Sequence, residues 1–149
     1  SRCLFSINAQ SGITIPAEFC GRPIVYVNWP DMHLSAWHNN SLVIFKKFFS
    51  NKKKRYLKFK EILDLDHKVL TSNFKIIQKK FDIVLEENSP DEIKDVVEEQ
   101  LKRINNEWVE TNEDKILQKK FWNIYEKKFI KSPTFRVGAN FLKKNIYLI

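Results

Sequence analysis

The stretch "ITIPAEFCGRP", residues 13 to 23, constrains the fold more than any other part of the chain. Gly21 is a natural stop for a helix, and Pro23 cannot continue one. Pro16 is accommodated in the first turn of a helix, where its missing N–H is no loss, so we expect the helix to begin near residues 13 to 15. The stretch therefore predicts one short helix that ends before Gly21.

Two apolar runs flank this short helix, at residues 3–7 and 22–28. Each is short and apolar throughout most of its length, which is typical of a buried strand. Two buried strands joined by a helix favour a parallel β-α-β unit, because the crossover returns the chain in the same direction. We therefore predict an α/β fold.

The next part of the chain gives weaker signals. We expect an aromatic, irregular segment at residues 29–49, a short helix at 56–64, a helix at 72–81 and a third strand at 82–87.

The clearest local signal follows that strand. Ser89 is the expected N-cap, Pro90 takes the first helical position, and Glu92 closes a capping box. The apolar face of this helix is predicted to consist of Ile93, Val96, Val97, Leu101 and Ile104.

The C-terminal part is predicted to be rich in helices, from about residue 113 to 145. A helix at 113–129 is expected to have an apolar side made of Ile116, Leu117, Phe121, Ile124 and Tyr125. The last segment is expected to contribute the apolar side chains Phe135, Val137, Phe141 and Leu142.

The composition is that of one soluble domain, residues 1–149. Its 43% hydrophobic content, with 12 Phe and 4 Trp, is too high for a disordered chain. No apolar run approaches the ~20 residues that span a bilayer, and nothing at the start resembles a signal peptide, so we expect a cytoplasmic location. Because the chain starts without Met inside an apolar run, we expect an upstream segment to be missing.

Cys3 and Cys20 are the only two cysteines, and each lies in an apolar stretch. This setting favours reduced thiols buried in the core over a disulfide framework or a metal site.

The net charge of +8 comes from one segment, residues 46–60, which we expect to be a basic loop. Of the 26 Lys and Arg residues, eight lie there without any acidic residue, and the remaining 18 equal the number of Asp and Glu residues. Three interpretations stay open: a solvated loop, a contact to anionic lipid or to a lipid-pyrophosphate acceptor, and a nucleic-acid patch. We favour the membrane or acceptor role because no nucleic-acid motif is present. The residues expected to make that contact are Lys52, Lys53, Lys54 and Arg55.

The loop "NAQSG", residues 8–12, follows the first predicted strand. In an open parallel sheet, ligands bind beyond the carboxyl ends of the strands. Gly12 allows close approach to the backbone, while Ser11 and Thr14 add hydroxyl donors. Taken alone, the loop fits a phosphate site and a simple helix cap equally well.

A resemblance favours the phosphate site. The segment "SINAQSGITIPAEFCGRPIVYVNWP" resembles the donor-binding strand, Ser-Gly loop and helix of glycosyltransferases built from two Rossmann-like domains, the GT-B architecture. The chain is similar to a family of bacterial glycosyltransferases of surface-polysaccharide clusters, and further similar segments follow in the family's order. They are "RYLKFKEIL", "ENSPDEIKDVVEEQLKRI", "LQKKFW" and "FRVGANFLKKN".

The resemblance implies a Rossmann-like parallel sheet flanked by helices, the C-terminal half of a GT-B enzyme. It also implies a nucleotide-sugar donor as substrate, no cofactor, and a glycan or lipid-linked acceptor at the inner face of the cell membrane. The donor-binding residues would be Asn8, Gln10, Ser11, Gly12, Ile13, Thr14 and Glu18. Glu18 would contact the sugar or ribose, although a solvated helix residue is the competing interpretation.

The resemblance places the catalytic base in the N-terminal domain, so these 149 residues are expected to be inactive alone. His33 and His38 are weaker candidates, and as loop histidines they need no catalytic role. Their spacing does not form a helical metal pair, and no zinc motif completes it, so no metal is expected. A basic module without catalysis and a sugar-nucleotide epimerase remain as alternatives.

Overall fold

The computed structural model describes the chain in five segments, residues 3–9, 14–32, 40–65, 74–126 and 135–149.

The main sheet has four parallel strands in the order β1-β2-β3-β7. These strands are β1 (Ser6–Asn8), β2 (Ile24–Trp29), β3 (Leu42–Phe45) and β7 (Arg136–Val137). Because the strands are parallel, all their carboxyl ends lie at one edge of the sheet and all their amino ends at the other. The predicted α/β class with a parallel sheet is confirmed.

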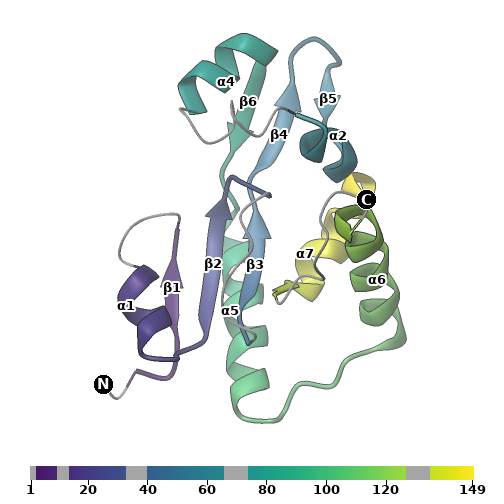
Figure 1. The fold of residues 1–149 in the computed structure, drawn as a ribbon. Coiled ribbons are helices and arrows are strands. Elements are labelled where there is room, and N and C mark those ends of the chain that lie inside the picture. Colours follow the sequence, from purple (N-terminus) through teal and green to yellow (C-terminus); the bar gives the residue numbers. More distant parts are fainter. Residues whose placement is uncertain (1–2, 10–13, 33–39, 66–73, 127–134) are drawn as a thin grey trace.

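A second sheet has three antiparallel strands in the order β5-β4-β6. They are β5 (Arg55–Tyr56), β4 (Lys47–Ser50) and β6 (Ile83–Glu86). Only Lys46 separates β3 from β4, so the second sheet extends the molecule beyond the carboxyl edge of the first (Figure 1).

Helices surround both sheets. They are α1 (Thr14–Phe19), α2 (Phe59–Leu63), α4 (Phe74–Phe81), α5 (Pro90–Ile104), α6 (Asn112–Glu126) and α7 (Ala139–Lys144), with a 3-10 turn at Ile146–Leu148. In Figure 1, α5 crosses behind β2 and β3, whereas α6 and α7 lie together on the β7 side. The parallel sheet is therefore flanked by helices, as predicted.

An aromatic cluster forms the centre of the core. Phe45 of β3 stacks on Phe121 of α6 with ring centroids 5.8 Å apart, and Phe59 of α2 meets Phe121 edge-on at 5.3 Å. Phe135 contacts Phe45 at 6.4 Å and Tyr125 at 5.6 Å. Such offset and edge-on pairs add to the stabilisation from burial alone, so this cluster ties α2 and α6 to the sheet.

Several predicted elements are confirmed. The first two strands pair in parallel, and α1 begins at Thr14, inside the predicted window. Gly21 has φ 63°, a left-handed conformation that glycine adopts without strain, and it follows the end of α1. The Ser89 capping box is present, with Ser89 Oγ accepting from the Glu92 N–H at 3.2 Å.

The expectation for residues 29–49 is wrong. This range contains β3, buried along its whole length, and most of β4. A strand between two parallel neighbours is buried on both faces, so it lacks the alternation that marks a half-exposed strand. The basic segment 46–60 likewise differs from the predicted loop, since it holds β4, a four-residue turn, β5 and the start of α2.

The first strand and the cysteines also differ from expectation. Among the described strands, β1 is an edge strand that pairs only with β2, and it is only partly buried, with Ile7 48% exposed. Cys3 and Cys20 are both exposed, form no disulfide within the described residues, and do not belong to the core. The apolar neighbours of the two cysteines misled the prediction, because Cys3 precedes β1 and Cys20 follows α1, so neither lies in a strand.

The predicted helix faces are partly confirmed. Val96 of α5 is buried, whereas Leu101 is 41% exposed. In α6, Leu117, Phe121 and Tyr125 are buried, and Ile116 is 55% exposed. The described part of this helix ends at Glu126. Phe135, Val137, Phe141 and Leu142 are all buried, and the short strand β7 among them was not predicted.

Candidate functional site

The loop predicted to hold phosphate connects β1 to α1. β1 ends at Asn8 and α1 begins at Thr14, so the loop leaves the carboxyl edge of the parallel sheet. The Asn8 side chain is half-buried and its Nδ2 donates to Ser6 Oγ at 3.0 Å. Gln10, Ser11, Gly12 and Ile13 lie outside the described residues, as do the side chains of Thr14 and Glu18. The last residue of β1, where the loop begins, thus lies at the carboxyl edge of the sheet, the edge at which ligands of open parallel sheets bind.

The neighbouring strand ends are joined by two asparagines. Asn28, near the end of β2, has φ 52°, and its backbone N–H donates to Asn88 Oδ1 at 2.6 Å. The Asn88 N–H donates back to Asn28 Oδ1 at 2.6 Å, and Asn88 Nδ2 donates to the Phe45 carbonyl at 2.8 Å. The carboxyl ends of β2 and β3 are thereby tied to the residue that precedes α5. A non-glycine residue with positive φ persists only where its surroundings hold it, as these bonds do here.

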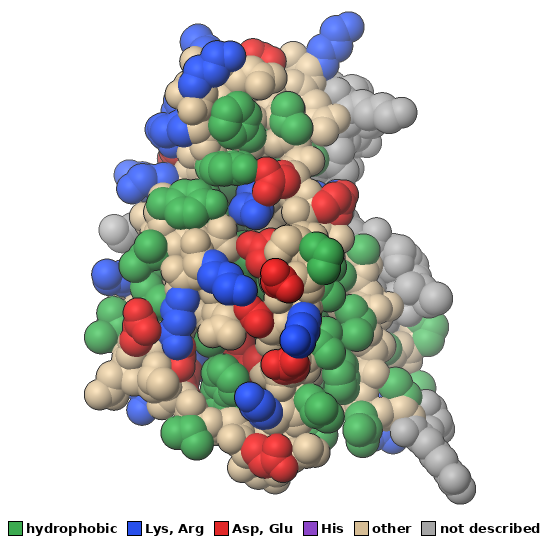
Figure 2. All heavy atoms as spheres, turned by 180° about the vertical axis from the view of Figure 1, so that it is seen from behind, with side chains coloured by type: hydrophobic (Ala, Val, Ile, Leu, Met, Phe, Trp, Pro, Cys, Tyr) green, Lys and Arg blue, Asp and Glu red, His purple; other side chains and the backbone are tan. Residues whose placement is uncertain are grey.

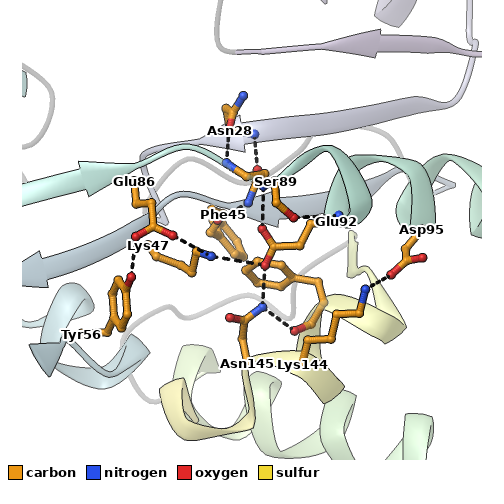
Figure 3. Close-up of polar contacts among 12 residues, drawn as sticks. Asn28, Phe45, Lys47, Tyr56, Glu86, Ser89, Glu92, Asp95, Lys144 and Asn145 are labelled. Carbon is orange, nitrogen blue, oxygen red and sulfur yellow. Dashed lines mark hydrogen bonds and ion pairs between the residues drawn. The ribbon is translucent and has the colours of Figure 1, made fainter.

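Charged side chains continue this network along the start of α5 (Figure 3). Lys47 Nζ lies 2.9 Å from Glu86 and 3.5 Å from Glu92. Glu92 also accepts from the Ser89 N–H and from Asn145 Nδ2, each at 2.9 Å. Burial lowers the pKa of Lys47, but the hydrogen bond from Lys47 to Glu86 and the charge of Glu92 outweigh burial and raise it. Because each of these groups has a protein partner, the network is suited to fixing the two sheets to α5 and less to binding a ligand.

Asp31 was missed by the sequence reasoning. It lies two residues beyond β2 and is only 1% exposed, which is unusual for a carboxylate. Burial, and then the charge of Asp31, raise the pKa of Tyr125 to about 12. The signal available in the sequence was the position just after a buried strand, which places Asp31 at the carboxyl edge. His33 and His38, further along the same connection, lie outside the described residues.

Half of the basic segment is neutralised by acidic partners. Glu61 accepts from Lys53 at 2.5 Å and from both Nη atoms of Arg55 at 2.8 and 2.9 Å. The hydrogen bond from Arg55, followed by that from Lys53, holds the pKa of Glu61 well below its usual range. Lys46 and Lys47 pair with Glu87 and Glu86 in the same way.

The other half of the segment projects freely. Its exposed side chains, which make no ion pair within the described residues, are Lys52, Lys54, Lys58 and Lys60. Figure 2 shows Lys and Arg side chains gathered at the upper end of the rear face, whereas both signs are interspersed lower down.

A cavity lies at the opposite, amino edge of the parallel sheet. Its volume is about 470 Å³. It is lined by residues at the starts of β2, β3 and β7 and by the C-terminal end of α5 with the segment that follows. None of the site residues predicted from the sequence lines this cavity, because its walls come from segments far apart in the chain.

The described residues include no group of three His, Cys, Asp or Glu side chains placed to hold a metal ion. Nor does any helix among them have the length and apolar character needed to cross a membrane.

Comparison with known proteins adds no family to these observations: no protein-family model matches the chain, and searches of curated proteins and of solved structures find no match either.

Proposed function

We propose that the loop at residues 8–14 binds the diphosphate of a nucleotide-sugar donor, and that the chain is the donor-binding half of a GT-B glycosyltransferase. The observation that carries the proposal is the parallel β1-α1-β2 unit, which places this loop at the carboxyl edge of the sheet. The similarity of residues 6–30 and of the later segments to surface-polysaccharide glycosyltransferases supports the same assignment.

The chemistry asked of this loop is electrostatic. In the transfer, the bond between the anomeric carbon and the diphosphate oxygen breaks, and a bond to an acceptor hydroxyl oxygen forms. The acceptor proton passes to a base, which we expect in the N-terminal domain of such an enzyme. Backbone N–H groups and the Ser11 and Thr14 hydroxyls would stabilise the negative charge that develops on the departing diphosphate. The six-residue helix α1 adds little dipole, so most of this stabilisation must come from direct hydrogen bonds.

Donor binding by the full-length gene product tests the proposal, with UDP-glucose and GDP-mannose as probes. The double variant Ser11→Ala and Gly12→Val is expected to bind the preferred donor at least about tenfold more weakly, since a Val side chain obstructs the backbone and a hydroxyl donor is lost. Lys102→Gln, an exposed change at the far end of α5, is the control. Unchanged donor affinity in the double variant would exclude the loop at residues 8–14 as the diphosphate site. Conversion of the donor without any acceptor would instead favour an epimerase.

The free lysines favour a second candidate, contact with an anionic membrane or acceptor. Vesicles of phosphatidylglycerol and of phosphatidylcholine distinguish charge-driven binding from general adhesion. Lys54→Gln is expected to weaken binding to the anionic vesicles several-fold, because Lys54 has no acidic partner among the described residues. Lys53→Gln is the matched control, since Glu61 already neutralises Lys53. Equal effects of the two changes, or stronger binding to RNA than to vesicles, would contradict the membrane role.

A further inference from the structure

The cavity at the amino edge of the parallel sheet is walled by polar side chains from four parts of the chain. Asn40 and Ser41 precede β3, Gln100 and Arg103 belong to α5, and Arg136 begins β7. Trp108, in the segment between α5 and α6, completes this wall. Since the strands are parallel, the cavity and the loop at residues 8–14 lie at opposite edges of the sheet.

Two guanidinium groups meet at this cavity. Arg103 donates through Nε and Nη2 to one oxygen of Glu99, at 2.9 and 2.8 Å, and packs over the Trp108 ring at 5.0 Å. Arg136 pairs with Glu110 and packs over the Trp122 ring, 5.4 Å from its centroid. A guanidinium has five N–H donors, so these carboxylates leave donors of both arginines for another acceptor.

The two positive charges act on each other. Burial lowers the pKa of Arg136, and the charge of Arg103 lowers it further. Glu99 is 3% exposed, and burial raises the pKa of its carboxyl group despite the nearby arginines. Its second oxygen accepts from the Ala139 N–H at 2.7 Å. An additional anion in the cavity would relieve the repulsion between the two guanidinium groups.

Three buried polar atoms of the cavity wall have no hydrogen-bond partner among the described residues. They are Gln100 Oε1, Trp108 Nε1 and Arg136 Nε. Gln100 is only 1% exposed, so bulk water does not satisfy its carbonyl oxygen. An unpaired buried polar group costs about 1–3 kcal/mol, so a molecule that supplied partners to these three atoms would be stabilised at this wall.

We propose that this cavity binds a small hydroxylated anion, such as a sugar acid or a sugar phosphate. The wall offers more donors than acceptors: Trp108, Arg136 and the spare N–H groups of Arg103 call for a carboxylate or phosphate. Gln100 Oε1 needs a donor, which a hydroxyl on the same molecule provides. A cavity of about 470 Å³ has room for a molecule of monosaccharide size.

The indole N–H of Trp108 is a local reporter for this site. In a ¹⁵N-labelled sample its NMR signal is separate from those of the backbone, and Trp108→Phe identifies it. Glucuronate and glucose 6-phosphate are the two anionic probes, and they distinguish a carboxylate from a phosphate ligand. Neutral glucose tests recognition of the hydroxyl groups without the charge, and inorganic phosphate tests recognition of the charge without the sugar hydroxyls. We expect at least one of the anionic sugars to shift the Trp108 signal saturably, and more tightly than glucose or phosphate.

Two variants test the assignment of the wall. Gln100→Leu removes the unpaired carbonyl oxygen at similar volume, and Arg136→Gln removes one guanidinium. Each is expected to weaken binding about tenfold or more, the equivalent of one good hydrogen bond to a charged ligand. Lys102→Gln, which removes an exposed charge from the same turn of α5, is the control and should bind as tightly as the wild type. If Arg136→Gln does not fold, Gln100→Leu alone decides.

Three results would overturn the proposal. No saturable shift of Trp108 below about 10 mM of either anionic sugar would leave water as the only occupant. Equally tight binding of glucose would show that the charge is not recognised, and equally tight binding of inorganic phosphate would show that the hydroxyl is not. The test is independent of the proposed donor loop, because the Ser11→Ala, Gly12→Val protein should give the same Trp108 shift as the wild type.

Discussion

Asn88 at the carboxyl edge and Gln100 at the amino edge make an instructive pair. Both are buried amide side chains, 6% and 1% exposed. Asn88 lies two residues before α5 and Gln100 lies within it. Asn88 uses its oxygen and its nitrogen in hydrogen bonds to β2 and β3, whereas Gln100 Oε1 has no partner among the described residues. At the carboxyl edge the Asn88 amide is thus paired within the fold, whereas at the amino edge the Gln100 oxygen beside the cavity has no partner among the described residues. Burial of a polar residue alone does not reveal its role; the state of its hydrogen bonds does.

The largest expected effect comes from breaking the satisfied amide. Asn88→Ala leaves the Asn28 N–H and the Phe45 carbonyl without their partners. We expect the free energy of unfolding to fall by about 2–3 kcal/mol, because each buried group then bears its desolvation cost. Urea denaturation followed by circular dichroism measures the change. Asn88→Asp keeps an acceptor for Asn28 but loses the donor to Phe45, so it should fall between the wild type and Asn88→Ala. A loss below about 0.5 kcal/mol for Asn88→Ala would mean that the asparagine pair does not hold this edge together.

The sequence predicted the Ser89 cap next to Asn88, but it did not predict that Asn88 pairs with Asn28. Ser89, Pro90 and Glu92 lie within four positions of each other, so local spacing predicts the helix start. Asn28, in contrast, is 60 residues away, and only the pairing of the strands brings it to Asn88.

The cavity was unpredictable for the same reason. Its wall combines residues from positions 23 to 136, none of which forms a local motif. β3 escaped prediction because burial on both faces removes its periodicity. The β1-α1-β2 unit was predictable because Pro16 and Gly21 constrain the backbone locally.

The N-terminal caps of α5 and α6 allow a matched comparison. Ser89 Oγ accepts from the Glu92 N–H at 3.2 Å at the start of α5, and Thr111 Oγ1 accepts from the Asp114 N–H at 3.2 Å at the start of α6. Ser89→Ala and Thr111→Ala should each lower the free energy of unfolding by about 1 kcal/mol. Thr111 follows directly on the segment that carries Trp108, so only Thr111→Ala is expected also to weaken binding of the anionic sugar. If both variants bind the anionic sugar equally tightly, the Thr111 cap does not support the cavity wall.

Two glutamates should respond to acid in opposite directions. The pKa of Glu61 is lowered by Arg55 and Lys53, so its stabilisation is present above its ordinary pKa of about 4.3 and is lost as the pH falls below it. The pKa of Glu99 is raised by burial, so its ionisation destabilises the fold as the pH rises above about 4.3, and acidification relieves this. Between pH 6 and 3, roughly the range that brackets the ordinary glutamate pKa, Glu61→Gln should therefore flatten the loss of stability. Glu99→Gln should steepen it. Thermal midpoints measured across this range give both slopes, and a flatter slope for Glu99→Gln would contradict the assigned burial.

The smallest expected effect on stability is also the most direct contrast with Asn88. Gln100→Leu replaces a buried side chain whose oxygen has no partner among the described residues with an apolar one of similar size. We expect the free energy of unfolding without ligand to change by less than about 0.5 kcal/mol or to rise, because no hydrogen bond to that oxygen is lost and its desolvation is relieved. The same urea denaturation used for Asn88→Ala measures it. With the anionic sugar present, the order reverses: the wild type gains stability from bound ligand and the Leu variant does not. A Gln100 side chain held by the fold would instead cost about as much as Asn88 when replaced, and ligand would stabilise both proteins equally. If the wild type is the more stable protein only when the anionic sugar is present, Gln100 serves binding. If the wild type is also the more stable one without ligand, Gln100 serves the fold.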